Sequence, residues 1–257
     1  MLTFLHQLTK QTKLMILSLL VLVPIGILSF VNAIPQDKAY HDFADQRVMF
    51  EIPNSFDVLS NLPFCLVGLW GMVLVFNKRR RHDDYWQWQV LFTGCFLIGL
   101  GSAYYHWNPN NATLLWDRLP MTVAFMGIIS LLTSERLSPK GGKRSLPFLI
   151  FIGCASAIYW YWSELQGRGD LRAYVLVQFG SMAYCLAMLL LYEKRDSNKY
   201  WSLLLGFYVL AKVFEATDEQ VYSMTQELVS GHSLKHLASA VALAMLFPIV
   251  KMEKTEN

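Results

Sequence analysis

Long apolar runs separated by short polar connections constrain this chain more than any other feature of its sequence. The first run, Leu14–Pro35, reaches the length of about 20 apolar residues that a helix needs to cross a bilayer. Hydrophobic residues make up 54% of the chain and charged residues only 16%, whereas soluble domains carry about 25% charged residues. Only helices and closed barrels satisfy their backbone in lipid, and runs of this length favour helices. The sequence therefore predicts an all-α integral membrane protein.

We expect seven more membrane spans after the first. They are Ser55–Phe76, Trp86–His106, Leu114–Thr133, Leu146–Trp162, Leu171–Tyr192, Tyr200–Thr217 and His232–Val250. Trp and Tyr residues gather near the ends of these runs, as they do at the two surfaces of a membrane. The first run can also be interpreted as a signal peptide, because Val31-Asn32-Ala33 resembles a cleavage site. Its length favours a retained helix.

Positive charges alternate between the connections. Basic residues follow the second, fourth and sixth spans and the last one, whereas Asn108–Thr113 carries none and Asp218–Gly231 is acidic. By the positive-inside rule, both termini are then cytoplasmic and the poorly basic connections lie outside. We expect an N-terminal helix over 1–35, an outer loop over 36–54, a seven-helix core over 55–251 and a cytoplasmic tail over 252–257.

Ionisable and polar residues in the apolar spans gather at their outer ends. His232 and His236 are four residues apart and so share a helix face, and His106 closes the third span at the same side. Three neutral imidazoles can hold Zn²⁺ with a fourth position open, and bound zinc lowers the pKa of water to about 7. Asp117 can accept a proton from that water, and Ser102 can donate a hydrogen bond to an oxyanion. This chemistry suits hydrolysis of an acyl bond in a lipid.

Several of these charged residues also have simpler interpretations. Asp117 can form an ion pair with Arg118 or Arg172, and Lys212 can neutralise Glu215 three residues later. We expect Lys235, inside the histidine motif, to extend outward to the membrane surface. The four cysteines lie inside apolar runs without metal-binding spacing, so neither disulfides nor cysteine ligands are expected. Phosphate-cradling loops and nucleic-acid patches are absent from the sequence, so no nucleic-acid partner is expected.

Four short motifs, in this order, resemble those of a known superfamily. They are Ser60-Asn61, the SxxxH element that ends in His106, the stretch Asp117–Met121 and the HxxxH element His232–His236. The superfamily contains the alkaline ceramidases, the progestin and adipoQ receptors and the GPI-lipid remodelling proteins. The resemblance covers about Asp42 to Val250 and is greatest to the bacterial-type branch of the alkaline ceramidases.

The resemblance implies a seven-helix core, with the first span as an additional N-terminal helix. It implies zinc on His106, His232 and His236, with Ser102 and Asp117 around the zinc-bound water. The implied reaction is hydrolysis of the amide of a ceramide-like membrane lipid to a sphingoid base and a fatty acid. It also suggests a calcium ion before the first core helix, where the chain offers oxygen ligands at Asp42, Asp45, Glu51, Asn54 and Asp57.

Two other functions fit the same residues. A metal-dependent esterase that remodels lipids would keep the metal and change the bond that is cleaved. A receptor-like membrane protein would use zinc only to hold helices together. Three histidines without a cysteine favour a catalytic site, because structural zinc sites are usually closed by four protein ligands.

Overall fold

The computed structural model describes residues 2–78 and 83–252, which are mostly helical. The long helices of the bundle and the short ones at its ends are α1 (Leu2–Gln7), α2 (Lys10–Ser29), η1 (Lys38–His41), α3 (Ser55–Leu59), α4 (Leu62–Asn77), α5 (Tyr85–Trp107), α6 (Asn111–Arg136), α7 (Pro139–Leu165), α8 (Arg172–Leu191), α9 (Asn198–Ala216), α10 (Asp218–Met224), α11 (Gly231–Ala244) and α12 (Phe247–Lys251). The only β structure in these residues is an isolated bridge between Met49 and Ile52.

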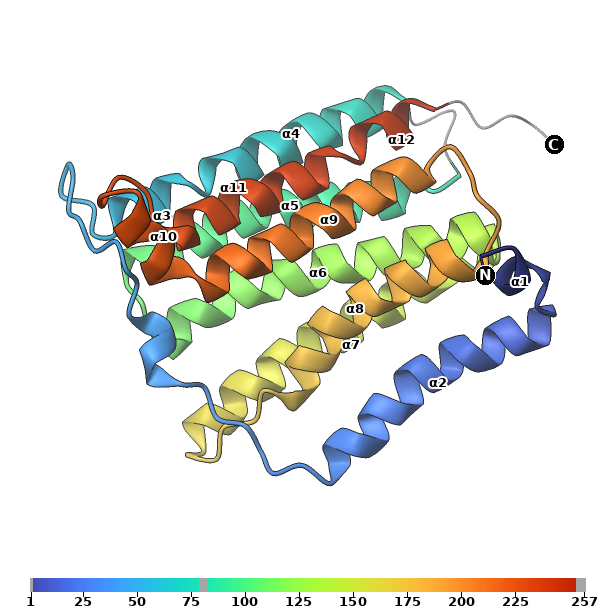
Figure 1. Ribbon diagram of the computed structural model, residues 1–257, viewed down its shortest axis with the longest axis horizontal. Helices are drawn as coiled ribbons and strands as arrows, with labels where there is room; N and C mark the ends of the chain where they lie inside the picture. The colour runs from blue at the N-terminus through green and yellow to red at the C-terminus, as the bar shows by residue number, and fades with distance from the viewer. Residues whose placement is uncertain (1, 79–82, 253–257) are drawn as a thin grey trace.

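The long helices lie side by side in one bundle, with α6 at its centre (Figure 1). Helix α6 packs against α5, α7 and α8, and 67% of its most apolar stretch is buried. Helix α2 lies at the edge of the bundle next to α8, and only 11% of its apolar stretch is buried. The apolar surface of α2 is therefore left to face lipid.

The chain is an all-α multi-pass membrane protein. Six helical segments of the described residues are long and apolar enough to cross a membrane: Lys10–Ser29, Ser55–Asn77, Asn111–Arg136, Pro139–Leu165, Arg172–Leu191 and Gly231–Lys251. Helices α5 and α9 are not among them, although both pack within the same bundle. The count of eight spans and the orientation of the termini stay predictions. The basic connection after the second span falls partly on residues 79–82, and the tail mostly on 253–257, both outside the described residues.

Two of the expected spans are interrupted in the structure. The span expected over Ser55–Phe76 divides into α3 and α4, and Pro63 stands in the first turn of α4. The last span divides into α11 and α12, with Pro248 in the first turn of α12. Proline has no N–H to donate and fits the first turn of a helix, so each proline starts a new helix. The first interruption matters for the site, because it places Ser60 between the two helices.

Two glycines allow close helix contacts at the end of the bundle that holds the histidines. A Cβ atom at Gly101 of α5 would lie 2.0 Å from the carbonyl oxygen of Trp116 in α6. A Cβ atom at Gly231 would lie 2.4 Å from the carbonyl oxygen of Phe214 in α9. Small residues permit such backbone approach between membrane helices. They bring α5 against α6, and the start of α11 against the end of α9.

Arg172 ties the end of α2 to the start of α8. Its guanidinium donates to the Leu28 carbonyl at 3.0 Å, while the Leu171 N–H donates to the Ile34 carbonyl at 2.9 Å. The same guanidinium makes two hydrogen bonds with the Asp170 carboxylate, at 2.8 and 2.7 Å. Asp170 therefore fixes the side chain that holds the peripheral helix.

This pair predicts a pH-dependent stability. The Arg172 guanidinium lowers the pKa of the Asp170 carboxyl to about 2, from an ordinary value of 3.8. Such a group stabilises the folded state above its unfolded pKa and loses that contribution as the pH falls toward its folded pKa. Asp170→Asn should thus lower the unfolding temperature in detergent at neutral pH, with the difference shrinking as the pH falls from about 4 to about 2. Asp196→Asn, at an exposed acid, is the control. A difference that is the same at every pH would contradict this assignment.

Candidate active site

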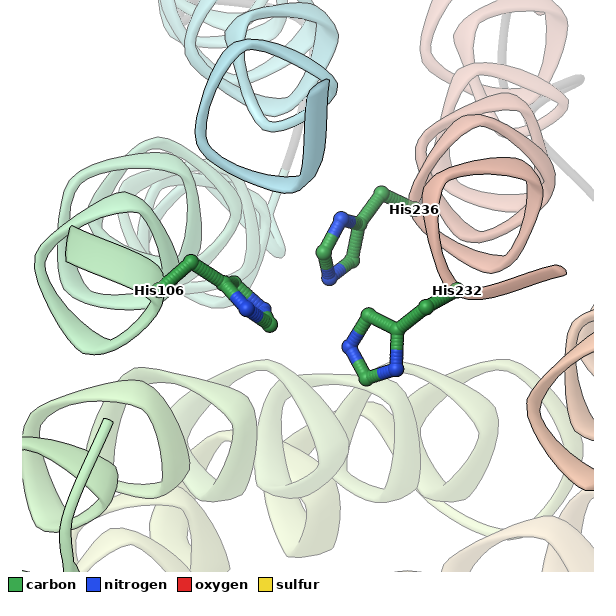
Figure 2. Close-up of side chains that lie close together, drawn as sticks. All are labelled: His106, His232 and His236. Carbon is green, nitrogen blue, oxygen red and sulfur yellow. The ribbon is translucent and has the colours of Figure 1, made fainter. Parts of the chain in front are cut away.

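Three buried histidines converge at one end of the bundle. His106 belongs to the last turn of α5, and His232 and His236 to the first two turns of α11. One ring nitrogen from each can be chosen so that all three lie within 4.8 Å of one another. Figure 2 shows the three rings facing a common point between α5 and α11. The structure thus brings together the three histidines that the sequence singled out.

The cluster fits a metal ion by its chemistry. The rings are packed edge to face, with centroids 4.8 to 4.9 Å apart. Nδ1 of His106 is buried without a hydrogen-bond partner among the described residues. A buried polar atom without a partner is costly, and a shared cation would remove that cost. Neutral imidazole nitrogens suit zinc among the common biological metals.

A hydroxyl outside the cluster orients one of these rings. Ser60 Oγ lies 2.7 Å from Nδ1 of His236, which leaves Nε2 to face the other two rings. A partner on the second ring nitrogen fixes the tautomer and the orientation of a metal-binding histidine. The sequence singled out Ser60 only as part of a family motif. Pro63, in the first turn of α4, is the sequence signal for the break between α3 and α4. Ser60 lies in that break.

The start of α11 is held by two aspartates from other helices. Asp57 Oδ1 accepts hydrogen bonds from the hydroxyls of Ser230 and Ser233, at 3.2 and 2.6 Å. Asp218 Oδ1 accepts the backbone N–H of His232 at 2.7 Å. Acidic side chains at a helix N-terminus satisfy its free N–H groups and complement its dipole. These bonds fix both histidines of the HxxxH element relative to α3 and α10.

The connection over 36–54 covers the cluster from the water-facing end of the bundle. The Phe43 ring is buried, with its centroid 4.5 Å from that of His106 and 4.7 Å from that of His232. Asn54 Nδ2 donates to the His106 carbonyl at 2.8 Å. His41 is held between the Tyr105 hydroxyl and Asn111 Oδ1, at 2.9 and 3.0 Å. The connection therefore shields the rings from bulk water.

A cavity of about 210 Å³ leads from the cluster into the apolar part of the bundle. His236, Ser102 and Asp117 line it beside the cluster, and Phe125, Met182 and Leu243 are among its apolar lining residues. The Ser102 hydroxyl is within hydrogen-bonding reach of the Asp117 carboxylate. The structure therefore places both predicted catalytic residues in the cavity that His236 adjoins.

The expected ion pairs of Asp117 do not form within the described residues. Arg118 donates to Gln36 Oε1 at 2.6 Å, and Arg172 pairs with Asp170. Neither arginine is therefore a direct ion-pair partner of Asp117 in this part of the chain. The Asp117 carboxylate instead lines the cavity.

Lys235 points inward, contrary to the expectation that it extends to the membrane surface. Its side chain is 16% exposed, and Nζ lies 3.2 Å from Glu215 Oε1 and 2.9 Å from Nε2 of His232. The expected pair of Lys212 and Glu215 is confirmed, but Glu215 also binds Lys235. A carboxylate inside the bundle stabilises the ammonium there, which the spacing within one helix did not reveal. A metal ion would compete with the Lys235 ammonium for Nε2 of His232. The ammonium could then keep Glu215 as its partner.

The five residues suggested for calcium do not converge. Within the described residues, the histidine cluster is the one group of three or more His, Cys, Asp or Glu side chains that could share a metal ion. The Asp45 carboxylate binds the Arg47 guanidinium, and the Asn54 amide and the Asp57 carboxylate are held by the partners given above. Asp42 and Glu51 are exposed. This geometry gives the calcium prediction no support.

Fold and site together define a multi-pass helical membrane protein with a buried three-histidine cluster beside a cavity that continues among apolar side chains. A family model described as Ceramidase matches residues 41–256, and the chain belongs to this family. The resemblance to ceramidases is thereby confirmed, and the family implies a hydrolase acting on an amide bond of a lipid. The match does not distinguish the bacterial-type branch, which stays a prediction. No curated protein matches the chain.

The contact between Ser60 and His236 yields a prediction about metal affinity. Ser60→Ala should weaken zinc binding by about tenfold, because the ring loses the partner that fixes its orientation. Competition with a chelator measures that affinity, and Ser60→Thr, which keeps a hydroxyl, serves as the control. Unchanged zinc affinity in Ser60→Ala would contradict the role given to this contact.

Proposed function

We propose that this protein is a zinc-dependent membrane amidase that hydrolyses the N-acyl bond of a ceramide-like lipid to a long-chain base and a fatty acid. The observation that carries the proposal is the shared cavity. One histidine of the cluster, a buried carboxylate and a buried hydroxyl line the same space, and that space continues into an apolar region. A site for amide hydrolysis in a lipid needs these four parts together.

His106, His232 and His236 are the residues that would hold zinc. Zinc supplies Lewis acidity, which makes water nucleophilic at neutral pH. Ser60 holds the His236 ring, and the bonds of Asp57 and Asp218 hold the helix that carries two of the three ligands. These contacts provide the rigid support that a metal centre needs to keep its geometry.

Asp117 is proposed as the general base and then the general acid. It takes a proton from the attacking water while the new bond from oxygen to the amide carbon forms. It returns that proton to the nitrogen as the carbon–nitrogen bond breaks, so the long-chain base leaves as a neutral amine. The Ser102 hydroxyl, near the same carboxylate, is proposed to donate a hydrogen bond to the amide oxygen as negative charge develops there.

The remaining surfaces of the cavity fit the lipid. Phe125, Met182 and Leu243 offer an apolar surface to a hydrocarbon chain. Phe43 shields the histidine rings on the opposite side. Apolar walls exclude bulk water, which strengthens the electrostatic interactions of Asp117 and Ser102 with the reacting amide.

The experiment measures bound zinc and released fatty acid for the purified protein with a panel of N-acyl lipids. Asp117→Asn should keep zinc and lose at least about a hundredfold in turnover, because general acid–base catalysis contributes that much or more. His236→Ala should lose zinc and turnover together. Asp196→Asn, an exposed acid remote from the cavity, is the control for removing a negative charge.

The outcomes separate the proposal from its rivals. Release of fatty acid from esters but not from amides would favour the lipid esterase. Bound zinc without product from any lipid would favour a receptor with structural zinc. Full turnover in Asp117→Asn would remove that residue from the mechanism, and a protein without zinc would remove the metal.

A further inference from the structure

Arg118 is a buried cation that forms no ion pair with a carboxylate of the described residues. Its side chain lies inside the bundle, with 5% of the residue exposed. Nη2 donates to the Gln36 amide oxygen at 2.6 Å, and Nη1 has no hydrogen-bond partner among the described residues. A buried charge without a partner is expensive, so such a group needs an explanation.

Five other cationic side chains of the described residues have a carboxylate partner, which Arg118 lacks. They are Arg47, Arg136, Arg172, Lys212 and Lys235. Arg136 is buried as deeply as Arg118 and bonds with Glu135. Burial alone therefore does not explain why Arg118 lacks a carboxylate partner.

Aromatic rings hold the guanidinium in place. Its central carbon lies 4.0 Å from the ring centroid of Trp160, 4.7 Å from that of Tyr174 and 5.7 Å from that of Tyr40. The faces of aromatic rings attract a cation without using its N–H donors. The arginine is thus fixed in position while the N–H donors of Nη1 stay unused.

Arg118 lines the same cavity as Asp117 and His236. Three cations line this cavity (Arg118, Lys212 and Lys235) against two carboxylates (Asp117 and Glu215), and Glu215 is shared by the two lysines. The excess of positive charge lies in the cavity that continues among apolar side chains. A negative group on the occupant would compensate it.

The arginine lies at the end of the cavity where a lipid headgroup would be. Tyr40 belongs to the water-facing connection and Tyr174 to the first turn of α8, and both are beside Arg118. Ends of membrane helices lie near the headgroups of the bilayer. The apolar residues Phe125 and Met182 lie further along α6 and α8, where hydrocarbon chains belong.

We propose that Arg118 binds an anionic oxygen group, a carboxylate or a phosphate, on the headgroup of the lipid substrate. The inference rests on the proposed amidase function and narrows its substrate class to N-acyl lipids with a negatively charged headgroup. The planar guanidinium presents N–H groups that match such oxyanions in two-point contacts.

The test compares two amides with the same acyl chain, N-palmitoylglycine and N-palmitoylethanolamine. On the amine side, the glycine amide carries a carboxylate where the ethanolamine amide carries a hydroxyl. The wild-type protein should favour the glycine amide in kcat/KM by about tenfold to a hundredfold, the usual worth of a hydrogen bond to a charged group. Arg118→Met should abolish this preference, and Arg118→Lys, which keeps the charge without the planar fork, should retain part of it.

Two controls separate a specific contact from general effects. Lys212→Met removes another cation from the same cavity and should keep most of the preference, because Lys212 already has a carboxylate partner. Arg118→Met is expected to fold, because replacing an unpaired buried charge with an apolar side chain of similar volume does not lower stability. Its unfolding temperature checks this directly.

Each remaining outcome decides the question. No preference in the wild-type protein, or an equal preference in Arg118→Met, overturns the proposal. If palmitate inhibits through Arg118 while the preference between the amides does not depend on it, Arg118 binds the product and the headgroup assignment is overturned. If neither amide is hydrolysed, the panel of N-acyl lipids decides on the proposed function, because neither amide carries a long-chain base. Equilibrium binding of the same amides to the same variants, followed by tryptophan fluorescence, then still supports or overturns the role of Arg118.

Discussion

The cost of removing polar groups from water governs this structure. In an apolar bundle, each polar side chain needs a partner from another part of the protein, or it lowers stability. At the histidine end, the partners come from distant segments: Asp57 binds Ser233, Asp218 binds the backbone of His232, and Ser60 binds His236. These bonds connect α3, α10 and α11 into one rigid end, so the features that make burial tolerable also fix the three rings.

Some buried polar atoms in and around the site do not follow this rule. Among the described residues, the atoms buried without a hydrogen-bond partner include Nδ1 of His106, Oδ2 of Asp57, Nη1 of Arg118 and the Tyr208 hydroxyl. In a folded protein such atoms are uncommon and call for an external ligand or a special role. The proposed metal would be the partner of the His106 ring, and the proposed lipid headgroup would be the partner of Arg118. Both therefore follow from unmet hydrogen bonds, and neither depends on which membrane side holds the site.

Local patterns in the sequence were enough for the fold class and for the three histidines. The four-residue spacing of His232 and His236 fixes their common face, and a helix end is a local signal for His106. No local pattern indicates the inward direction of Lys235, because it depends on Glu215 in α9. The rotation of the two helices decides whether these side chains meet. The contact of Ser60 depends likewise on a break between α3 and α4. The residues suggested for calcium are close in sequence, but two of their carboxylates have other partners. Asp45 binds Arg47, and Asp57 accepts hydrogen bonds from Ser230 and Ser233.

The cover over the histidines has a kinetic consequence. Phe43 and the connection around it shield the rings on the water-facing end, while the cavity continues among apolar residues. A lipid that reaches the site through the bilayer diffuses in two dimensions, so the relevant substrate concentration is its mole fraction in the membrane. Diluting the substrate with other lipids should then slow turnover, whereas diluting the membranes in buffer should not. Bilayer composition, which sets lateral diffusion and packing around α2 and α8, becomes a regulator of the rate without binding to the protein.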